Sequence, residues 1–405
     1  MSLVIHKYGG TSVANAERVK TVAKKLVDLK LKGDDVVVVV SAPAGMTDEL
    51  INRAKAISKN PSKREMDVLL TTGEQISIAL LAMAIHELGH DAVSYTASQV
   101  GIRTTSQHSS AKITSIDTCK IKEKLAEKHI VIVAGFQGVT ANNDFTTLGR
   151  GGSDTTGVAL GVALGAKCVE IYTDVDGVYT ADPRMVPNAK KIHEISYEEM
   201  LELAATGAKV LHSRSVELAY KNNIEVHLRS SFVDSLGTLV KGKVDKMEEA
   251  IIRGISHSEH EARISILGVP DEPGIAARIF NHIAKHNINI DIIVQGGGIG
   301  DHNDVTYILK EDLYEEALKI SEEIAKEIGA KGVEGTKDVA MVSLVGVGIK
   351  SNSGIAAKIF DAFGKENINI DIISSSEIKV SCVIPQKDLK KAITALHERF
   401  IEGKN

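Results

Sequence analysis

The residues best suited to chemistry lie in the stretch from Thr146 to Thr156, which reads TTLGRGGSDTT. Its three glycines allow the backbone to approach a ligand closely. Ser153 and Asp154 are expected at the cap and first turn of a helix running to Leu164, whose free N–H groups attract anions. Arg150 adds a two-pronged donor for a carboxylate. The stretch predicts a phosphate or carboxylate site, and a plain strand-to-helix turn is the alternative.

Asp154 is acidic where an anion is expected to bind, which is explained best if it orients a cation or a lysine. Lys7 ends a short apolar strand that begins at Leu3, and it is followed by Gly9 and Gly10. A helix from about Asn15 to Gly33 and a second strand, Val36 to Ser41, then complete a parallel strand-helix-strand unit.

Ligands of open α/β sheets bind outside the carboxyl ends of the strands. The glycine-rich stretch itself follows a buried-strand pattern, His129 to Ala134, with a predicted loop between them. We expect one crevice to contain the residues at the ends of the first two strands. These residues are Lys7, Gly9, Gly10, Ser41 and Thr47.

Residues 62–89 have a helical pattern with a predicted break near Thr72-Gly73. Glu74 would then lie in the first turn of a second helical segment, either as a binding carboxylate or as a simple cap. The segment ends in His86-Glu87-Leu88-Gly89-His90, which matches a zinc-protease pattern in letters only. Gly89 is expected to stop the helix before His90, so we predict no metal site there.

A further strand, Cys168 to Thr173, opens into a loop with Asp174, Tyr179 and Arg184. Acids, a tyrosine and an arginine at the carboxyl end of a strand suit a nucleotide, and an acidic surface loop is the alternative. Ser196 to Glu199 reads as a capping box that opens a helix. Lys209 follows that helix and offers a second lysine to the site.

Composition is that of an ordinary globular protein. The chain has 405 residues, a formal net charge of -5, 25% charged and 43% hydrophobic residues, which suits two or three domains. Acids and bases are interspersed and aromatics are few, so we predict no nucleic-acid partner. Three scattered cysteines fit a reducing compartment. The longest aliphatic run has strand length, so we expect a cytoplasmic protein without a membrane span.

The last third contains an internal repeat. Residues 274–293 recur as residues 354–373, with fourteen of the twenty positions identical. Each copy has the order strand, helix, strand, strand, helix, which predicts two ferredoxin-like units. The first has a closing strand at residues 332–339, but the second runs out of chain. We predict that residues 249–256 supply the missing strand to the second copy, because an open edge is a liability.

Taken together, these motifs resemble those of bacterial monofunctional aspartate kinases, members of the amino-acid kinase family that end in two ACT-type regulatory units. The resemblance covers essentially the whole chain. It rests on three motifs in this order: Lys7-Tyr8-Gly9-Gly10, residues 149–154, and Thr173 to Gly177. One departure is Asn352-Ser353-Gly354, where such proteins often have proline before the glycine.

The resemblance implies an α/β amino-acid kinase fold, with a mostly parallel sheet sandwiched by helices, followed by two βαββαβ ACT units. The implied domains are residues 1–245 for catalysis, 262–338 for the first ACT unit, and 339–405 plus the strand 249–256 for the second. The implied reaction is ATP- and Mg²⁺-dependent phosphorylation of the L-aspartate side chain to 4-phospho-L-aspartate, which begins lysine, threonine and methionine biosynthesis.

The resemblance also assigns roles to residues. Catalysis is expected from Lys7, Asp154 and Lys209, with Asp154 fixing the two lysines. ATP is expected to contact Lys7, Gly9, Gly10, Thr173, Asp174, Tyr179, Arg184 and Lys209. Aspartate is expected to contact Ser41, Thr47, Glu74, Arg150 and Ser153, with Glu74 on the ammonium group.

Regulation by lysine, threonine or both is implied for the repeats. The glycine turns open helices, and the repeated acids would take an ammonium group, although capping and turning explain each acid equally well. The expected effector residues are Asp271, Gly274, Ile275, Ala276, Asn289, Asp291, Gln295, Gly354, Ile355, Ala356, Asn369, Asp371 and Glu377. A homodimer or higher homo-oligomer through the repeats is expected, and Met247 is a possible internal start for a short regulatory subunit.

Two other functions compete with this interpretation. A kinase for glutamate, acetylglutamate or a nucleoside monophosphate would share the fold, but the pair of Arg150 and Glu74 suits a zwitterionic substrate. An amino-acid sensor with a decayed kinase would keep the repeats, but Lys7, Arg150 and Asp154 are all intact.

Overall fold

The computed structural model describes residues 2–207, 210–242, 251–296, 302–350, 352 and 354–403. The chain forms two compact units. The second unit comprises residues 179–190, Thr206 and Gly207, and the described chain from residue 251 onward, and the first comprises the other described residues. Lys209 and Met247 lie outside the described residues.

The first unit is built on an eight-stranded sheet with the order β12-β14-β13-β9-β1-β2-β6-β3. Neighbouring strands are parallel except β13 and β14. The strands are β1 (Leu3–Tyr8), β2 (Asp35–Val40), β3 (Ala92–Tyr95), β6 (Ile130–Ala134), β9 (Cys168–Thr173), β12 (Glu194–Ser196), β13 (Glu225–Ser230) and β14 (Thr238–Lys241). The central strands β2 and β6 are almost wholly aliphatic because helices cover both of their faces.

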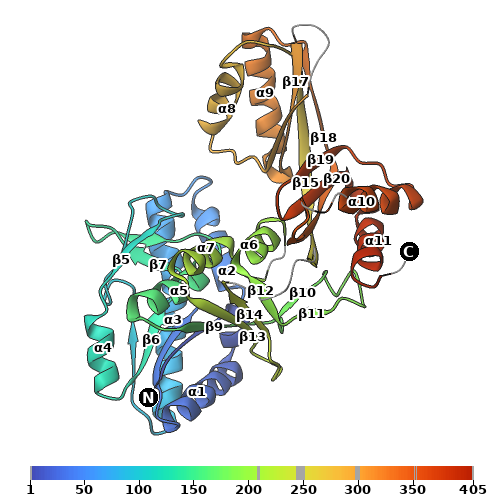
Figure 1. The fold of residues 1–405 in the computed structure, drawn as a ribbon. Helices are drawn as coiled ribbons and strands as arrows, with labels where there is room; N and C mark the ends of the chain where they lie inside the picture. The colour runs from blue at the N-terminus through green and yellow to red at the C-terminus, as the bar shows by residue number, and fades with distance from the viewer. Residues whose placement is uncertain are drawn as a thin grey trace. The chain divides into compact units, whose positions relative to one another are not determined.

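Helices cover the two faces of this sheet (Figure 1). On one face, Tyr8, Leu26 and Leu81 share a core, which places α1 and α3 there. On the other face lies α5, whose Gly157 backs onto the Lys7 side chain. The helices of the unit are α1 (Ala16–Leu31), α2 (Met46–Ile57), α3 (Lys63–Glu87), α4 (Cys119–Ala126), α5 (Gly152–Leu164), α6 (Tyr197–Ala205) and α7 (Ser213–Asn222), with a short 3-10 helix η1 (Gly10–Val13).

The connection between β6 and the glycine-rich stretch is a hairpin and not a plain loop. Its strands β7 (Gln137–Val139) and β8 (Phe145–Thr147) belong to a second sheet with the order β5-β4-β7-β8. The other two strands are β4 (Ile102–Thr104) and β5 (Ile113–Ile116). Strands of three or four residues give too short an alternation for the sequence to reveal them. The second strand of the hairpin, which ends at Thr147, forms the start of the glycine-rich stretch.

The predicted break at Thr72-Gly73 is wrong, because α3 is one continuous helix. Gly73 is a close-packing position: a Cβ added there would lie 2.7 Å from the Cβ of Ala42. The predicted stop at the other end is confirmed, since α3 ends at Glu87 and Gly89 has φ +79°. By length and composition α3 is apolar enough to cross a membrane, yet its buried face carries Asp67 and Glu74, as in the core helix of a globular unit.

The second unit contains a six-stranded antiparallel sheet with the order β16-β17-β15-β18-β20-β19. Its strands are β15 (Ile251–Pro270), β16 (Ile292–Gly296), β17 (His302–Lys310), β18 (Gly332–Val347), β19 (Ile372–Ser375) and β20 (Lys379–Pro385). The missing strand is where we predicted it: residues 251–258 pair with residues 341–347 of the second repeat. The same two long strands also close the first repeat, through the pairing of residues 261–267 with 332–339.

Each repeat has its own helical layer and core (Figure 1). The first repeat packs α8 (Ile275–Ala284) and α9 (Tyr314–Ile328) on the sheet, and the second packs α10 (Gly354–Lys365) and α11 (Leu389–Phe400). Two 3-10 turns, η2 (Glu311–Leu313) and η3 (Gln386–Asp388), precede α9 and α11.

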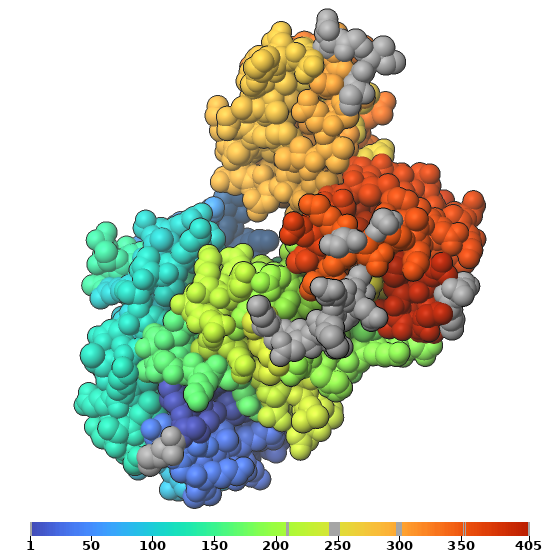
Figure 2. Space-filling model, viewed as in Figure 1, coloured from blue at the N-terminus to red at the C-terminus, as the bar shows by residue number. Residues whose placement is uncertain are grey.

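Residues 179–190, from the first half of the chain, are part of the second repeat's core. Ala181 and Val186 are buried in the same cluster as Ile255, Val342 and Phe363. Thr180 accepts a hydrogen bond from Ile255 N at 2.7 Å, and its hydroxyl lies 3.0 Å from Nε2 of the buried His397. The green atoms of this segment lie against the red atoms of the second repeat (Figure 2). The chain therefore contributes to the second unit before the repeats begin.

Candidate active site

The carboxyl ends of β1, β2, β6 and β9 lie along one edge of the first unit's sheet, because these strands are parallel neighbours. A Cβ added at Gly10 would lie 2.6 Å from Ala42 O, and one added at Gly135 would lie 2.7 Å from Ser153 Oγ. The ends of β1, β2 and β6 and the start of α5 therefore meet in one place. This is the edge at which open α/β sheets bind ligands.

Lys7 and Asp154 form an ion pair at this edge, as the sequence analysis expected. Lys7 Nζ lies 2.6 Å from Asp154 Oδ1, and the two side chains are only 9% and 12% exposed. Gly157, one turn after Asp154, gives the lysine room, since a Cβ there would lie 3.2 Å from Lys7 Cβ. A Cβ at Gly9 would lie 3.6 Å from Lys7 Nζ, so the ammonium group also faces the glycine backbone.

The start of α5 is bare of side-chain caps. Its N-cap is Gly151, with φ +69° and no capping hydrogen bond, so our placement of Ser153 at the cap is corrected: Ser153 and Asp154 lie in the first turn. Gly149 also has φ +80°. Left-handed backbone at both glycines turns the chain sharply into the helix. In that turn Gly152 N and Asp154 N already donate to Gly149 O and Gly151 O, at 3.0 and 3.1 Å, so an anion there would be attracted mainly by the positive end of the helix dipole.

Glu74 is a buried carboxylate aimed at the same edge. It is 3% exposed, and its Oε1 accepts a hydrogen bond from Ala42 N at 3.0 Å. Its Oε2 is buried without a hydrogen-bond partner among the described residues. Burial raises the pKa of Glu74 to about 8, and the bond from Ala42 partly opposes that rise. Since α3 is continuous, Glu74 lies in the middle of the helix. The alternative that Glu74 is a simple helix cap is therefore wrong.

The remaining residues expected to bind aspartate are placed by neighbouring elements. Ser41 follows β2, and its N–H donates to Tyr8 O at 3.1 Å. Thr47 lies in the first turn of α2, which begins after Gly45. Arg150 is exposed in the glycine-rich stretch, and its guanidinium makes no hydrogen bond or ion pair with the residues that the structure describes.

The residues expected to bind ATP divide between the two units. Thr173 and Asp174 end β9 in the first unit, where the threonine hydroxyl donates to Asp174 Oδ1 at 3.1 Å. Tyr179 and Arg184 belong to the second unit. The Arg184 guanidinium binds both oxygens of Asp182, at 3.0 and 2.6 Å, and these bonds lower the pKa of that carboxyl group.

The sequence analysis missed two residues beside the glycine-rich stretch. His212, the N-cap of α7, abuts Gly151, where an added Cβ would lie 2.3 Å from the His212 Cβ. Burial lowers the pKa of His212, and the nearby Asp154 opposes that shift. Arg214 donates to Leu148 O and, at 2.9 Å, to Ala111 O. A histidine and an arginine at the start of an ordinary helix give no signal in the sequence alone.

In the second unit, the acids expected to bind an effector contact groups of their own chain. Asp291 Oδ2 lies 3.5 Å from Lys310 Nζ, and Asp371 Oδ2 lies 3.1 Å from Arg263 Nη1. The other two acids behave similarly: Asp271 accepts from Asn303 Nδ2 at 2.9 Å, and Glu377 lies 3.7 Å from Lys350 Nζ.

The glycine turns of the two repeats precede helices. Gly274 is the N-cap of α8, with φ +90°, and α10 begins at Gly354. The remaining expected effector residues lie in or beside these helices and the following strands: Ile275, Ala276, Asn289, Gln295, Ile355, Ala356 and Asn369.

A cavity of about 340 Å³ lies elsewhere in the first unit, between α1 and the strands, and includes His6, Tyr172 and Arg229 in its wall. Successive side chains of a strand point to opposite faces, so His6 and Lys7 are on opposite sides of the sheet. This cavity is therefore not part of the candidate active site.

Comparison with known proteins agrees with this geometry. The model of the amino acid kinase family matches residues 2–230, and an ACT domain model matches residues 264–323 and 342–400. An aspartate kinase of Pseudomonas putida is 49% identical over 401 residues, which are 99% of this chain and 98% of that protein.

Two solved structures of E. coli aspartokinase III are 26% identical to this chain. The complex with aspartate and ADP has a TM-score of 0.82 and covers 99% of this chain and 100% of that one. The complex with lysine and aspartate has a TM-score of 0.75, with 98% and 99% covered. With its kinase sheet, its Lys7–Asp154 pair and its two repeats, the chain belongs to the aspartokinases, which combine an amino acid kinase domain with ACT domains.

Proposed function

We propose that the protein transfers the γ-phosphoryl group of ATP to the side-chain carboxylate of L-aspartate, giving 4-phospho-L-aspartate, the first step toward lysine, threonine and methionine. The observation that carries this proposal is the buried Lys7–Asp154 pair beside the uncapped start of α5. An ammonium group beside the positive end of a helix dipole is suited to neutralising a phosphoryl group in transfer.

The chemistry needs no general base, because a carboxylate is already a competent nucleophile. The protein must align two anions and offset their repulsion. Asp154 holds the Lys7 ammonium in place, and Lys7, Gly9 and Gly10 face the phosphates. No group of three or more His, Cys, Asp or Glu side chains in the described part of the chain is placed to hold a metal. We propose that Mg²⁺ is carried on the phosphates of ATP, where it would offset their charge.

Arg150 and Glu74 would recognise the two ends of the amino-acid substrate. Arg150 has its guanidinium free for a carboxylate, and the unpartnered Oε2 of Glu74 is free for an ammonium group. Ser41, Thr47 and Ser153 would complete the contacts with polar hydrogens. A substrate that lacks the ammonium group would leave Glu74 buried without a partner, which disfavours acetylated amino acids.

ATP would lie along Thr173 and Asp174, with Tyr179, Arg184 and Lys209 completing its site. The complex of the E. coli relative with aspartate and ADP supports this choice of substrates. We propose the domain limits 1–245, 262–338 and 339–405 with strand 249–256, and a cytoplasmic location.

The proposal is tested by ADP release with aspartate, glutamate, acetylglutamate and no acceptor. Trapping with hydroxylamine adds a direct readout, because an acyl phosphate is converted to a hydroxamate. We expect ADP release and hydroxamate formation only when aspartate is the acceptor. ADP release that does not depend on aspartate, or a stronger hydroxamate signal with glutamate, would refute the proposed acceptor.

Regulation through the repeats is the second part of the proposal. We propose that lysine, threonine or both bind near the glycine turns at Gly274 and Gly354, in a homodimer or larger oligomer. The lysine complex of the E. coli relative supports an amino-acid effector. Activity is expected to fall with one or both amino acids at millimolar concentration, and to fall less in Asp271→Ala. If neither amino acid changes the rate, the effector is a different molecule.

A further inference from the structure

Asp67 is a buried carboxylate on α3 that none of the roles above uses. Its side chain is fully buried, and it lies two turns before Glu74 on the same helix, with both residues on the buried face. Taking a carboxylate out of water is costly unless several donors reach it. The cost of burying such a group is offset only where its hydrogen-bond donors are held in a defined arrangement.

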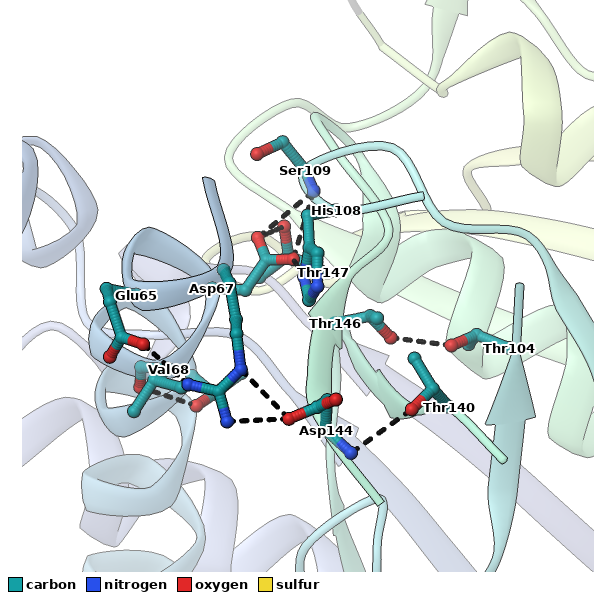
Figure 3. Close-up of polar contacts among 12 residues, drawn as sticks. Glu65, Asp67, Val68, Thr104, His108, Ser109, Thr140, Asp144, Thr146 and Thr147 are labelled. Atoms are coloured by element: carbon teal, nitrogen blue, oxygen red, sulfur yellow. Dashed lines mark hydrogen bonds and ion pairs between the residues drawn. The ribbon is translucent and has the colours of Figure 1, made fainter. Parts of the chain in front are cut away.

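Two separate segments supply those partners (Figure 3). The Thr147 hydroxyl of β8 donates to Asp67 Oδ1 at 2.7 Å. From the loop between β4 and β5, Ser109 N donates to Oδ2 at 3.0 Å and His108 Nδ1 lies 2.8 Å from the same oxygen. Both carboxylate oxygens are therefore bound, one mainly by each segment.

Both segments lead to the glycine-rich stretch. Thr147 precedes Arg150 by three residues, and its carbonyl accepts from Ala111 N at 3.0 Å. Ser109 O lies against Gly149, where an added Cβ would be 3.1 Å away. A shift of the carboxylate of Asp67 would therefore act on the backbone at Thr147 and Gly149, directly before Arg150.

The same helix thus holds one end of the proposed aspartate site and anchors the other. Glu74 on α3 would bind the ammonium group, and Arg150 on the anchored turn would bind a carboxylate. Since the two ends of a bound amino acid are a fixed distance apart, the spacing between Glu74 and Arg150 must be fixed as well. A displacement of about 1 Å is enough to reduce activity by roughly a hundredfold.

We infer that Asp67, together with His108 and Thr147, forms a positioning network for the aspartate site. This inference rests on the proposed function. None of the three residues touches the substrate. They hold the Thr147–Arg150 turn at a set distance from Glu74, so their loss acts on aspartate binding before it acts on ATP.

The first test replaces the bond donor at Thr147. Thr147→Val keeps the shape of the side chain and removes the hydroxyl, whereas Thr147→Ser keeps the hydroxyl. We expect the KM for aspartate to rise roughly tenfold in Thr147→Val, the equivalent of one lost hydrogen bond to a charged group. The KM for ATP should stay within about twofold, and Thr147→Ser should behave like the wild type in both.

Asp67→Asn and His108→Gln extend the test to the other members, and Arg64→Gln is the matched control. Arg64 lies on the same helix and binds Asp144, which directly precedes β8, but half of its side chain is exposed. An exposed pair contributes little, so Arg64→Gln should leave both KM values unchanged. Asp67→Asn and His108→Gln should raise the KM for aspartate selectively.

A purely structural role would give a different pattern. Thr147→Val would then melt at a lower temperature while its KM for aspartate stayed within twofold of the wild type, and that result would overturn the inference. A parallel rise in both KM values would overturn it too. The test does not depend on whether Asp67→Asn folds well, because the comparison of Thr147→Val with Thr147→Ser is sufficient by itself. A wild-type protein that fails to phosphorylate aspartate would refute the proposed function itself, before any variant is measured.

Discussion

Glu74 combines deep burial with one oxygen that has no partner in the described structure, and this makes its charge depend on the ligand. With a pKa raised to about 8 by burial, the free carboxyl group holds a proton at neutral pH. Binding an ammonium group requires the carboxylate, so aspartate binding should release that proton. We expect kcat/KM for aspartate to rise with pH up to about 8 and then level off, because this ratio reports the free enzyme.

Glu74→Gln should remove that rise, with a lower kcat/KM at all pH values. The same shift has an effect on stability. The folded state holds the Glu74 proton more tightly than the unfolded state, so this group's contribution is fully present below its ordinary pKa of 4.5 and is lost as pH rises to about 8. Unfolding free energies of wild type and Glu74→Gln should converge in acid and diverge near pH 8. A wild-type rate profile without an ascending limb would contradict this account.

The role of Lys7 must be tested with two variants, because Lys7 forms a buried ion pair with Asp154 and is not a free cation. Lys7→Met should reduce turnover by a hundredfold or more, through loss of a charge at the transferring group. It also leaves the Asp154 carboxylate buried without its partner, which costs about 3–5 kcal/mol of stability. Chemical denaturation and turnover should therefore both show a loss.

The double variant Lys7→Met/Asp154→Asn separates the two effects. Removing both charges should restore much of the stability that Lys7→Met loses, while turnover stays at least a hundredfold below that of the wild type. Recovery of activity along with stability would mean that Lys7 serves the fold and does not face the phosphates.

At the scale of elements, Gly73 sets the contact between α3 and the end of β2. Replacing glycine by alanine inside a helix usually stabilises by about 0.5–1 kcal/mol. Gly73→Ala should instead destabilise, since its Cβ would lie 2.7 Å from that of Ala42. The displaced Ala42 N–H would also weaken its bond to Glu74, so the KM for aspartate should rise.

Gly364 provides the matched control. It lies in α10, and a Cβ added there would meet nothing within 4 Å. Gly364→Ala should therefore raise the melting temperature, whereas Gly73→Ala should lower it. Equal and stabilising effects of the two changes would show that α3 has room to move away from β2.

The elements differ in how far the sequence predicts them. Lys7 and Asp154 were predictable because each follows a local pattern, an apolar strand end or a glycine-rich helix start. The continuity of α3 was not predictable. Gly73 is explained by its close contact with Ala42, which is distant in the sequence. The Asp67 network was missed for the same cause: its partners are 41, 42 and 80 residues away. Local chemistry can be predicted from periodicity, but contacts between distant segments leave no periodic signal.

At the scale of the molecule, Val186 belongs to the regulatory core although it lies in the chain before the repeats. It is 4% exposed, among side chains of the second repeat. Val186→Ala should lower the stability of the second unit by about 1–3 kcal/mol, measured as a shift in its unfolding transition. The KM for ATP should rise with it, because Tyr179 and Arg184, which are expected to contact ATP, lie in the same segment.

Val175→Ala is the control in the neighbouring loop, where the valine is 37% exposed. Its effect on stability should stay within about 0.5 kcal/mol. If Val186→Ala destabilises the second unit and leaves the KM for ATP unchanged, the nucleotide does not depend on residues 179–190.

The placement of residues 179–190 also bears on how such a protein can be divided into subunits. No single cut separates the two units, because the second one takes part of its core from within the first half of the chain. A short regulatory chain that started near Met247 would be made without Ala181 and Val186, and would expose the apolar surface that they cover. A long chain could not cover that surface with its own residues 179–190, because they already fill its own second repeat. A short chain would therefore have to bury the surface in a contact of its own.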